Sequence, residues 1–460
     1  MLSPLTTLAT LALQLLAADV GGTHAPVGVH LGVGVGVGVV GGDVVAGVDV
    51  GVGIETSPFA LHLRAPPLFR LVDLPPTVPS SQPSACRVFR CEEALSGQRL
   101  DPTALARIID EVRLFRPGDV VHARVGRLTA TLGTGGTVDR LTTMASWDRR
   151  TSGAFGSLRL PLQDLRADVV VADVISPLEL VAGRVEGAPL PFIPIVVGVE
   201  GALDAFAPDD VVDDAGVVGP TLVTRPVGAG LVDVRVPITL GVFSLAPRGE
   251  LSATTGLTAD GGSVDGGAGG VAAGGGGAVG LEAGFKVSFV ELSALTMVGA
   301  SSPGHRRGLF STFHLVERRR ALVGSAVDGG GLVHVPAPGG PSLDVRLEAS
   351  ILDTVAPLLR LHLEPSPGAN AVEVGTVFDL DPVQVSLSVI RRGFVDVGGV
   401  VDGDVDARPV LVAAEAAWRV VGPVSLWARW YRLPRFGGGA LKADDDVLVG
   451  VAIAGALQPR

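Results

Sequence analysis

The chain has 460 residues, of which 47% are hydrophobic, and a formal net charge of −11. Its 64 glycines and 33 prolines are spread along the sequence and exclude an architecture of long helices, because both residues destabilise helix interiors. No basic patch is concentrated enough for nucleic-acid binding.

Residues 1–18 form the only long uncharged stretch that resembles a membrane helix. The apolar core from Leu8 to Leu16 is too short to span a bilayer, and the small residues Ala17 and Ala18 follow it. This pattern predicts a signal peptide over 1–18, with cleavage as late as Ala25 as an alternative, although no Lys or Arg precedes the apolar core. Residues 26–460 are then expected to form one exported domain.

The first segments of that domain alternate with a period of two. Residues 27–39 place Val or Leu at every odd position and mostly Gly at the even ones. A helix would lose about 1 kcal/mol at each of these glycines, so the pattern predicts a strand. After the turn residues 41–43, residues 44–54 repeat the alternation. Strands of about a dozen residues suit a tilted crossing of a bilayer better than a soluble sheet.

The same alternation returns downstream, with ionisable residues on one face and apolar residues on the other. In a membrane barrel the ionisable face would enclose the lumen. The predicted lumen-lining residues are Arg159, Arg166, Asp168, Arg184, Glu186, Asp233, Arg235, Asp344, Arg346, Glu348, Arg360 and Glu364.

About sixteen strands, within a range of 14–18, are expected from the alternation and the turn signals. Short turns alternate with longer loops, which favours an all-β, transmembrane, up-and-down antiparallel barrel. A sheet that spans a membrane cannot keep a free edge, so residues 446–457 should pair with the first strand. The small residues of that last strand would face the glycines of the first. A soluble secreted sandwich, such as an adhesin or binding protein, remains the alternative architecture.

Two segments are predicted not to be strands. Residues 75–117 read as an insertion that carries Cys86 and Cys91 and a short helix over 101–115, which begins at Asp101-Pro102. The two cysteines of an exported chain favour a disulfide, with two unrelated thiols as the alternative. The insertion is either a plug or cap on the barrel or a surface excursion. Residues 258–279 are rich in Gly and Ala and predict a flexible loop.

Scattered motifs resemble a group of uncharacterised outer-membrane β-barrel proteins of Gram-negative bacteria. They are the Arg116-Pro117-Gly118-Asp119 turn after the predicted helix, the run 132–138, the run 147–150, and the stretch from Pro303 to Arg318. The resemblance implies the fold and an outer-membrane location, and no activity. The chain departs from such barrels in ending Gln458-Pro459-Arg460 without an aromatic residue. Aromatics are 4% of the chain, with Trp427, Trp430 and Tyr431 as a candidate fragment of an interfacial girdle.

No motif for a nucleophile, a phosphate loop, a cofactor or a metal is present, so we expect neither an enzyme nor a cofactor. The acidic clusters Asp209-Asp210, Asp213-Asp214 and Asp444-Asp445-Asp446 are expected to be solvated loops, with weak cation binding as the alternative. The runs His305-Arg306-Arg307 and Arg318-Arg319-Arg320 are expected to be solvated loop faces, or else cationic patches at the mouth or against phosphate headgroups.

Two functions follow from a lumen of mixed charge. If water fills it, the barrel is a passive pore for small solutes; if the charges pair across it, the barrel is plugged and structural. The expected partners are outer-membrane lipids, lipopolysaccharide and the barrel-assembly machinery. The sequence leaves the oligomeric state open.

Overall fold

The computed structural model describes residues 28–40, 43–56, 58–65, 68–72, 109–133, 136–139, 141–142, 152–160, 164–174, 177–190, 193–212, 221–258, 271–311, 339–352, 354–364, 370–392, 410–437 and 440–457. The predicted signal peptide, the two cysteines and the second arginine run lie outside these ranges, so those expectations stay predictions. Within the described ranges, no helix is long and apolar enough to cross a membrane.

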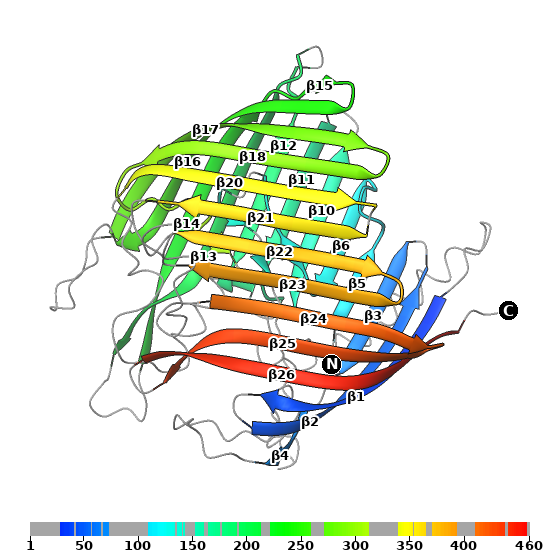
Figure 1. Cartoon of the computed structure of the whole chain (residues 1–460). Coiled ribbons are helices and arrows are strands. Elements are labelled where there is room, and N and C mark those ends of the chain that lie inside the picture. The colour runs from blue at the N-terminus through cyan, green and yellow to red at the C-terminus, as the bar shows by residue number, and fades with distance from the viewer. Residues whose placement is uncertain are drawn as a thin grey trace, which may run out of the picture.

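The long strands of the first and last parts of the chain confirm the alternation seen in the sequence. They are β1 (Gly28–Val40), β2 (Asp43–Glu55), β3 (Phe59–Ala65), β4 (Leu68–Val72), β24 (Val410–Val421), β25 (Val424–Gly437) and β26 (Ala440–Leu457). β1 pairs with β2 along its whole length and with β26 from Val29 to Val39. The last strand therefore closes the sheet onto the first, and the expected barrel is confirmed (Figure 1).

The middle of the chain supplies the rest of the ring. Its strands are β5 (Ile109–Leu114), β6 (Val121–Gly126), β10 (Gly153–Leu160), β11 (Leu165–Val171), β12 (Val181–Gly187), β13 (Val196–Val212), β14 (Thr221–Arg235), β15 (Ile238–Leu240), β16 (Phe243–Thr258), β17 (Val271–Val287), β18 (Val290–Ser301), β20 (Gly340–Ile351), β21 (Val355–Leu363), β22 (Ala371–Leu380) and β23 (Val383–Arg392). β3 and β4 both pair with β2, so they share one position in the ring. β14 and β15 likewise share one position, because both pair with β16. Twenty positions therefore make up the ring, rather than about sixteen.

The helix expected over 101–115 is wrong for its described part. Residues 109–114 form β5, which pairs with β3 and β6. The apolar residues Ile109 and Val112 fit a helical spacing, but Val112 and Leu114 also alternate with Glu111 and Arg113. Pairing on both edges satisfies the backbone hydrogen bonds of a closed sheet, and that requirement outweighs the local helical signal. The insertion thus ends before residue 109 instead of at 117.

The loop expected over 258–279 is wrong from residue 271 onward, because β17 begins there and pairs with β16 and β18. The four glycines 274–277 lie within the strand. Glycine is unfavourable in a strand unless another group must approach closely. The backbone of His305 approaches Gly274, and the imidazole ring of His305 approaches Gly276.

The connections differ in length at the two ends of the ring. Strands alternate in direction, so the connections β5–β6, β10–β11, β12–β13, β14–β16, β17–β18, β20–β21, β22–β23 and β24–β25 meet at one end, and Figure 1 shows those from β17 to β25 at its right-hand end. By the same alternation, the long connections over residues 73–108, 259–270 and 312–339 join strands at the other end of the ring. We call these the turn end and the loop end.

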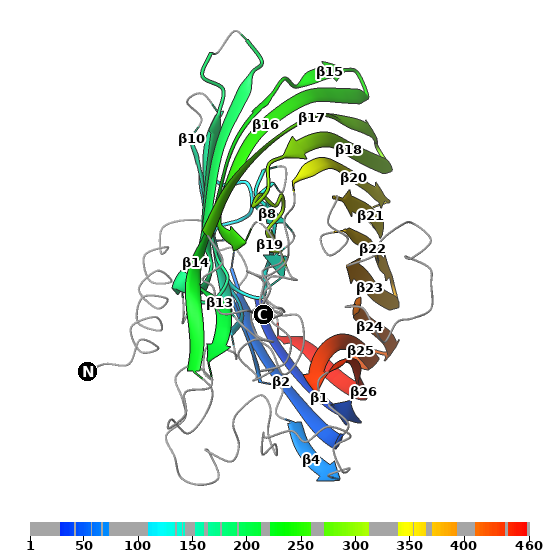
Figure 2. The same ribbon diagram turned by 90° about the vertical axis from the view of Figure 1, so that its left-hand side faces the viewer.

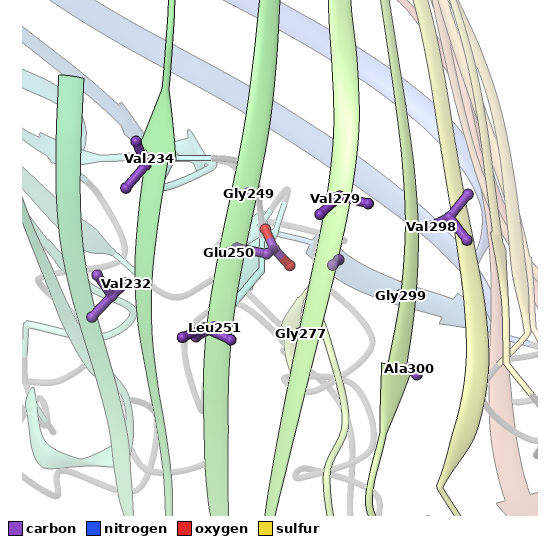
Figure 3. Close-up of a pocket in the computed structure, with 11 residues that line it drawn as sticks. Val232, Val234, Gly249, Glu250, Leu251, Gly277, Val279, Val298, Gly299 and Ala300 are labelled. Carbon is purple, nitrogen blue, oxygen red and sulfur yellow. The ribbon is translucent and has the colours of Figure 1, made fainter. Parts of the chain in front are cut away.

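The outward face of the ring is apolar. Val232, Leu251, Val279 and Val298 project from four neighbouring strands, and all are more than two-fifths exposed. Between them Gly249 and Gly277 leave a shallow groove of about 480 Å³ on the wall (Figure 3). A second sheet does not cover this face among the described residues, so a sandwich is excluded for them and the ionisable residues are left for the interior.

Candidate functional site

Two chain segments lie inside the ring. Segment I (128–142, described at 128–133, 136–139 and 141–142) follows β6, and segment II (302–311) follows β18. Segment I contributes β7 (Thr129–Ala130), β8 (Val138–Asp139) and β9 (Leu141–Thr142), and segment II contributes β19 (Phe310–Ser311). β19 pairs in parallel with β8, and Figure 2 shows both inside the ring of strands.

Segment II lies against β16 and β17. The inward residues Glu250, Ser252 and Thr254 alternate along β16, and each contacts one residue of segment II. Thr254 donates to the carbonyl of Gly304 at 2.7 Å, and Ser252 Oγ lies 2.8 Å from His305 Nε2. A period-two row of wall side chains therefore matches the extended backbone of the segment.

Glycines 274 and 276 of β17 make this approach possible. They pair with Thr254 and Ser252 on β16, so they lie beside the same contacts. A Cβ on Gly274 would overlap the backbone of His305, and one on Gly276 would overlap its imidazole ring. Segment II therefore packs directly against the glycine-rich run of β17.

Arg307 joins segment II to two distant strands. Its guanidinium donates to Glu250 on β16, with Nη2 to Oε2 at 3.1 Å, and to Asp344 on β20, with Nη1 to Oδ2 at 2.9 Å. All three side chains are at most 5% exposed. Asp344 also accepts from Arg360 at 3.3 Å and lies 3.4 Å from His362. Removing one member of such a buried group leaves its partners uncompensated.

A second buried cluster surrounds Arg184 on β12. Its guanidinium donates to Glu186 at 2.9 Å, reaches Glu200 at 3.5 Å, and donates to Asp233 on β14 at 3.1 Å. Gly198 lies on β13 between Arg184 and Asp233, and a Cβ there would overlap both side chains. The absence of a side chain at this position lets the ion pair cross an entire strand.

Segment I connects this cluster to segment II. The backbone N–H of Val138 donates to Glu200 at 3.2 Å, and Gly133 lies against the guanidinium of Arg184. The N–H of Gly308 donates to the carbonyl of Gly136 at 2.7 Å. An apolar cluster fills the space between the segments and the inward small residues of β11 to β14. It contains Leu128, Ala130, Leu132, Val138, Leu141, Val170, Ala172, Leu180, Ala182, Ala202, Ala207, Val227, Leu309 and Phe310.

Burial lowers the pKa of His305 below its ordinary value, and the positive charge of Arg307 adds to that effect against the opposing Glu250 and Glu364. The ring is therefore neutral at pH 7. His305, Arg306 and Arg307 are each at most 6% exposed, so the expectation of a solvated face for this run is wrong. The contacts to the wall bury it.

The twelve residues predicted to line the lumen all lie on the inward-facing side, because each alternates with outward apolar neighbours. Arg184, Asp233, Asp344 and Arg360 are buried in the two ion-pair clusters, and Asp168 is buried in a separate ion pair with Arg166. Arg159 and Glu348, near the turn end, are exposed. The others, intermediate in exposure, are Arg166, Glu186, Arg235, Arg346 and Glu364. Contact of any of them with a solute stays a prediction.

Sequence reasoning missed Glu200, Glu250 and Arg307 as members of the interior. Glu200 and Glu250 lie in strands with the same alternation and were recoverable from it. Arg307 was not, because its place depends on a connection that turns inward. Both inner segments coincide with motifs on which the family resemblance was based, at 132–138 and from 303.

The closing seam holds a further inward aromatic. The indole of Trp427 lies against Gly36 of β1 and Gly450 of β26, with the guanidinium of Arg429 4.8 Å from its ring centre. Tyr431 is buried and donates to Glu415. Of the three residues suggested as a girdle fragment, only Trp430 lies on the outward face and is exposed.

No family model matches the chain, and no curated protein matches it. Similar solved structures include Pseudomonas aeruginosa OccK5 (OpdH), at 9% identity over 94% of this chain and 98% of that one, with a TM-score of 0.34. Acinetobacter baumannii OccAB2 matches at 9% identity over 94% and 98%, with a TM-score of 0.35. Pseudomonas aeruginosa OpdK with vanillate matches at 10% identity over 94% and 99%, with a TM-score of 0.34. Sequence identities and TM-scores this low support no inference about the activity of this chain.

Proposed function

We propose that the chain is an outer-membrane β-barrel of a Gram-negative bacterium and a passive pore for small solutes, and that it has no enzymatic activity. The closed ring with an apolar outward face and an ionisable inward face supports this proposal, because that arrangement suits lipid outside and water inside. Barrels of 16–18 strands already leave an aqueous channel, and this ring is wider.

Within that proposal, the inner segments narrow the passage on the side of β11 to β18. The exposed inward residues Arg159 and Glu348 lie near the turn end and would meet a solute that enters there. The buried ion pairs of Arg184 and Arg307 would hold the segments against the wall rather than bind the solute. Lipids, lipopolysaccharide and the assembly machinery are the partners that this location requires.

A structural barrel with a plugged lumen is the second candidate. The observation that favours it is the extent of the internal contacts, since ion pairs, hydrogen bonds and an apolar cluster all join the segments to the wall. The two functions differ in whether ions cross a membrane that contains the protein.

Single-channel recording in a planar bilayer tests the pore. We expect stepwise conductance from the purified protein, and a larger or less stable conductance from Arg307→Gln, because segment II loses its ion pairs with Glu250 and Asp344. Arg116→Gln is the matched control: Arg116 is exposed in the β5–β6 turn, outside the inward rows of the strands, and its removal should leave conductance unchanged. A silent membrane with both the native protein and Arg307→Gln would favour the plugged barrel.

A further inference from the structure

The turn end carries apolar residues where soluble proteins place polar ones. Six successive connections, from β12–β13 to β24–β25, span residues 188–195, 236–242, 288–289, 352–354, 381–382 and 422–423, and Asp353 and Asp381 are their only charged residues. Turns in water are normally rich in Asp, Asn, Ser and Gly. Five of these connections keep one such residue and add large apolar residues beside it. We call these six connections the apolar rim.

Large side chains at the rim are exposed. Leu240, Phe289, Leu352, Leu380 and Val421 lie at or next to the tips of five of the turns and are 51–68% exposed. Leu190 and Ile193 extend the rim to the β12–β13 connection, where both are exposed by more than a third. Exposed apolar surface of this extent on neighbouring turns marks a contact with something other than water.

Outward aromatic residues stand immediately inside the rim. Phe243 and Phe285 pair across β16 and β17 with ring centres 5.2 Å apart, and Phe378 and Trp418 occupy similar places on β22 and β24. In membrane proteins such aromatics mark the level of the lipid headgroups. The turn tips begin where these aromatics end, which places them in the headgroup layer.

The rim continues the outward wall and differs from the rest of the turn end. Along β16 the outward apolar row runs from Leu251 to Phe243 and on to Val242 without a charged residue on that face. The difference is one of charge: the β5–β6 turn adds the exposed Arg116 and Asp119 to its exposed Phe115 and Val120, and the β10–β11 turn carries Asp164. An apolar surface that continues a lipid-facing wall is expected to contact lipid as well.

We infer that the apolar rim lies in the membrane interface, with its turn tips in contact with lipid instead of projecting into the aqueous compartment. The inference rests on the proposed membrane location. It means that the ring enters the bilayer more deeply on the side of β12 to β25 than on the side of β5 to β11.

Spin labelling tests this directly. In full-length protein with Cys86→Ser and Cys91→Ser, nitroxides are attached at Leu240→Cys, Leu352→Cys or Leu380→Cys, and the protein is reconstituted into phosphatidylcholine vesicles. Collision rates with O₂, which concentrates in lipid, are compared with those of a water-soluble nickel chelate. We expect the ratio of the O₂ rate to the nickel rate at all three positions to lie above the ratio in water and below that of the hydrocarbon core. Arg116→Cys at the same end is the aqueous control and gives the ratio in water.

A label at Val279→Cys on the outward wall distinguishes a failure of the proposed membrane barrel from a failure of the rim inference. If Val279 is itself open to the nickel chelate, the proposed membrane barrel fails. If Val279 is protected while the rim labels collide with nickel as Arg116 does, the rim inference alone is overturned. Protection of the rim labels from both reagents, together with dipolar broadening, would assign the rim to a second copy of the chain and also overturn it.

Discussion

His305 lies at the centre of the internal packing, where it contacts Ser252 of β16 and the glycines 274 and 276 of β17. Its identity was visible in the sequence, but its environment was not. The basic run around it predicts a solvated loop by composition alone. The buried position follows from a connection that turns inward, which no local pattern in residues 303–308 indicates.

The lowered pKa of His305 makes the packing of segment II sensitive to acid. Because the folded state disfavours the protonated ring, this contribution to stability is complete above about pH 6.5 and is lost as the pH falls below that value toward the lowered folded-state pKa. Thermal unfolding followed by gel shift between pH 7.5 and pH 5 should show the loss in the native protein.

The His305→Gln variant should lack this part of the pH dependence, since glutamine does not titrate. His30→Gln is the matched control, because His30 is exposed and lies away from segment II on β1. Equal pH profiles for the native protein and His305→Gln would contradict the assigned role.

At the scale of the elements, β17 and segment II depend on each other. The glycines 274–277 look like a flexible linker in the sequence, yet they form a strand whose inward positions accept the backbone and the side chain of His305. A composition rich in glycine predicts flexibility only when nothing packs on it. Pairing of both edges with β16 and β18 removes that freedom.

Gly274→Ala should therefore displace segment II. The added methyl group overlaps the backbone of His305, and overpacking of this kind costs about 1–3 kcal/mol. Urea-induced loss of the folded gel band measures the effect. Gly249→Ala on the neighbouring strand is the control: its Cβ would meet no atom within 4 Å, so we expect its midpoint to stay within error of the native one. Equal midpoints for the two variants would exclude the close approach.

At the scale of the whole molecule, closure of the ring brings the ends of the chain together. β1 and β26 are nearly the full sequence apart, and Trp427 of β25 fills the inward space that their glycines leave. The small inward residues of β26 were expected to meet the glycines of β1, and the pairing of Gly36 with Gly450 confirms it.

Trp427→Ala should weaken the closed ring, because it leaves a cavity behind Gly36 and Gly450. Trp427 is partly buried, so the loss should be smaller than the about 3–5 kcal/mol that truncation of a fully buried aromatic costs. The temperature at which the folded gel band disappears should fall. Trp430→Ala is the matched control, because Trp430 is outward and 39% exposed, and it should have a much smaller effect. If that temperature falls more for Trp430→Ala than for Trp427→Ala, the contact of Trp427 with Gly36 and Gly450 does not stabilise the closed ring.

The sequence by itself determined the strand period, the inward and outward faces, the hairpin of β1 with β2, and the closure by β26. These features follow from alternation, which is a local property of a strand whose two faces meet different surroundings. Only the tertiary structure decided the twenty positions, the strand at 109–114 and the burial of residues 304–307. Each depends on pairing or packing between segments distant in the chain, where satisfying backbone groups and buried charges outweighs local preference.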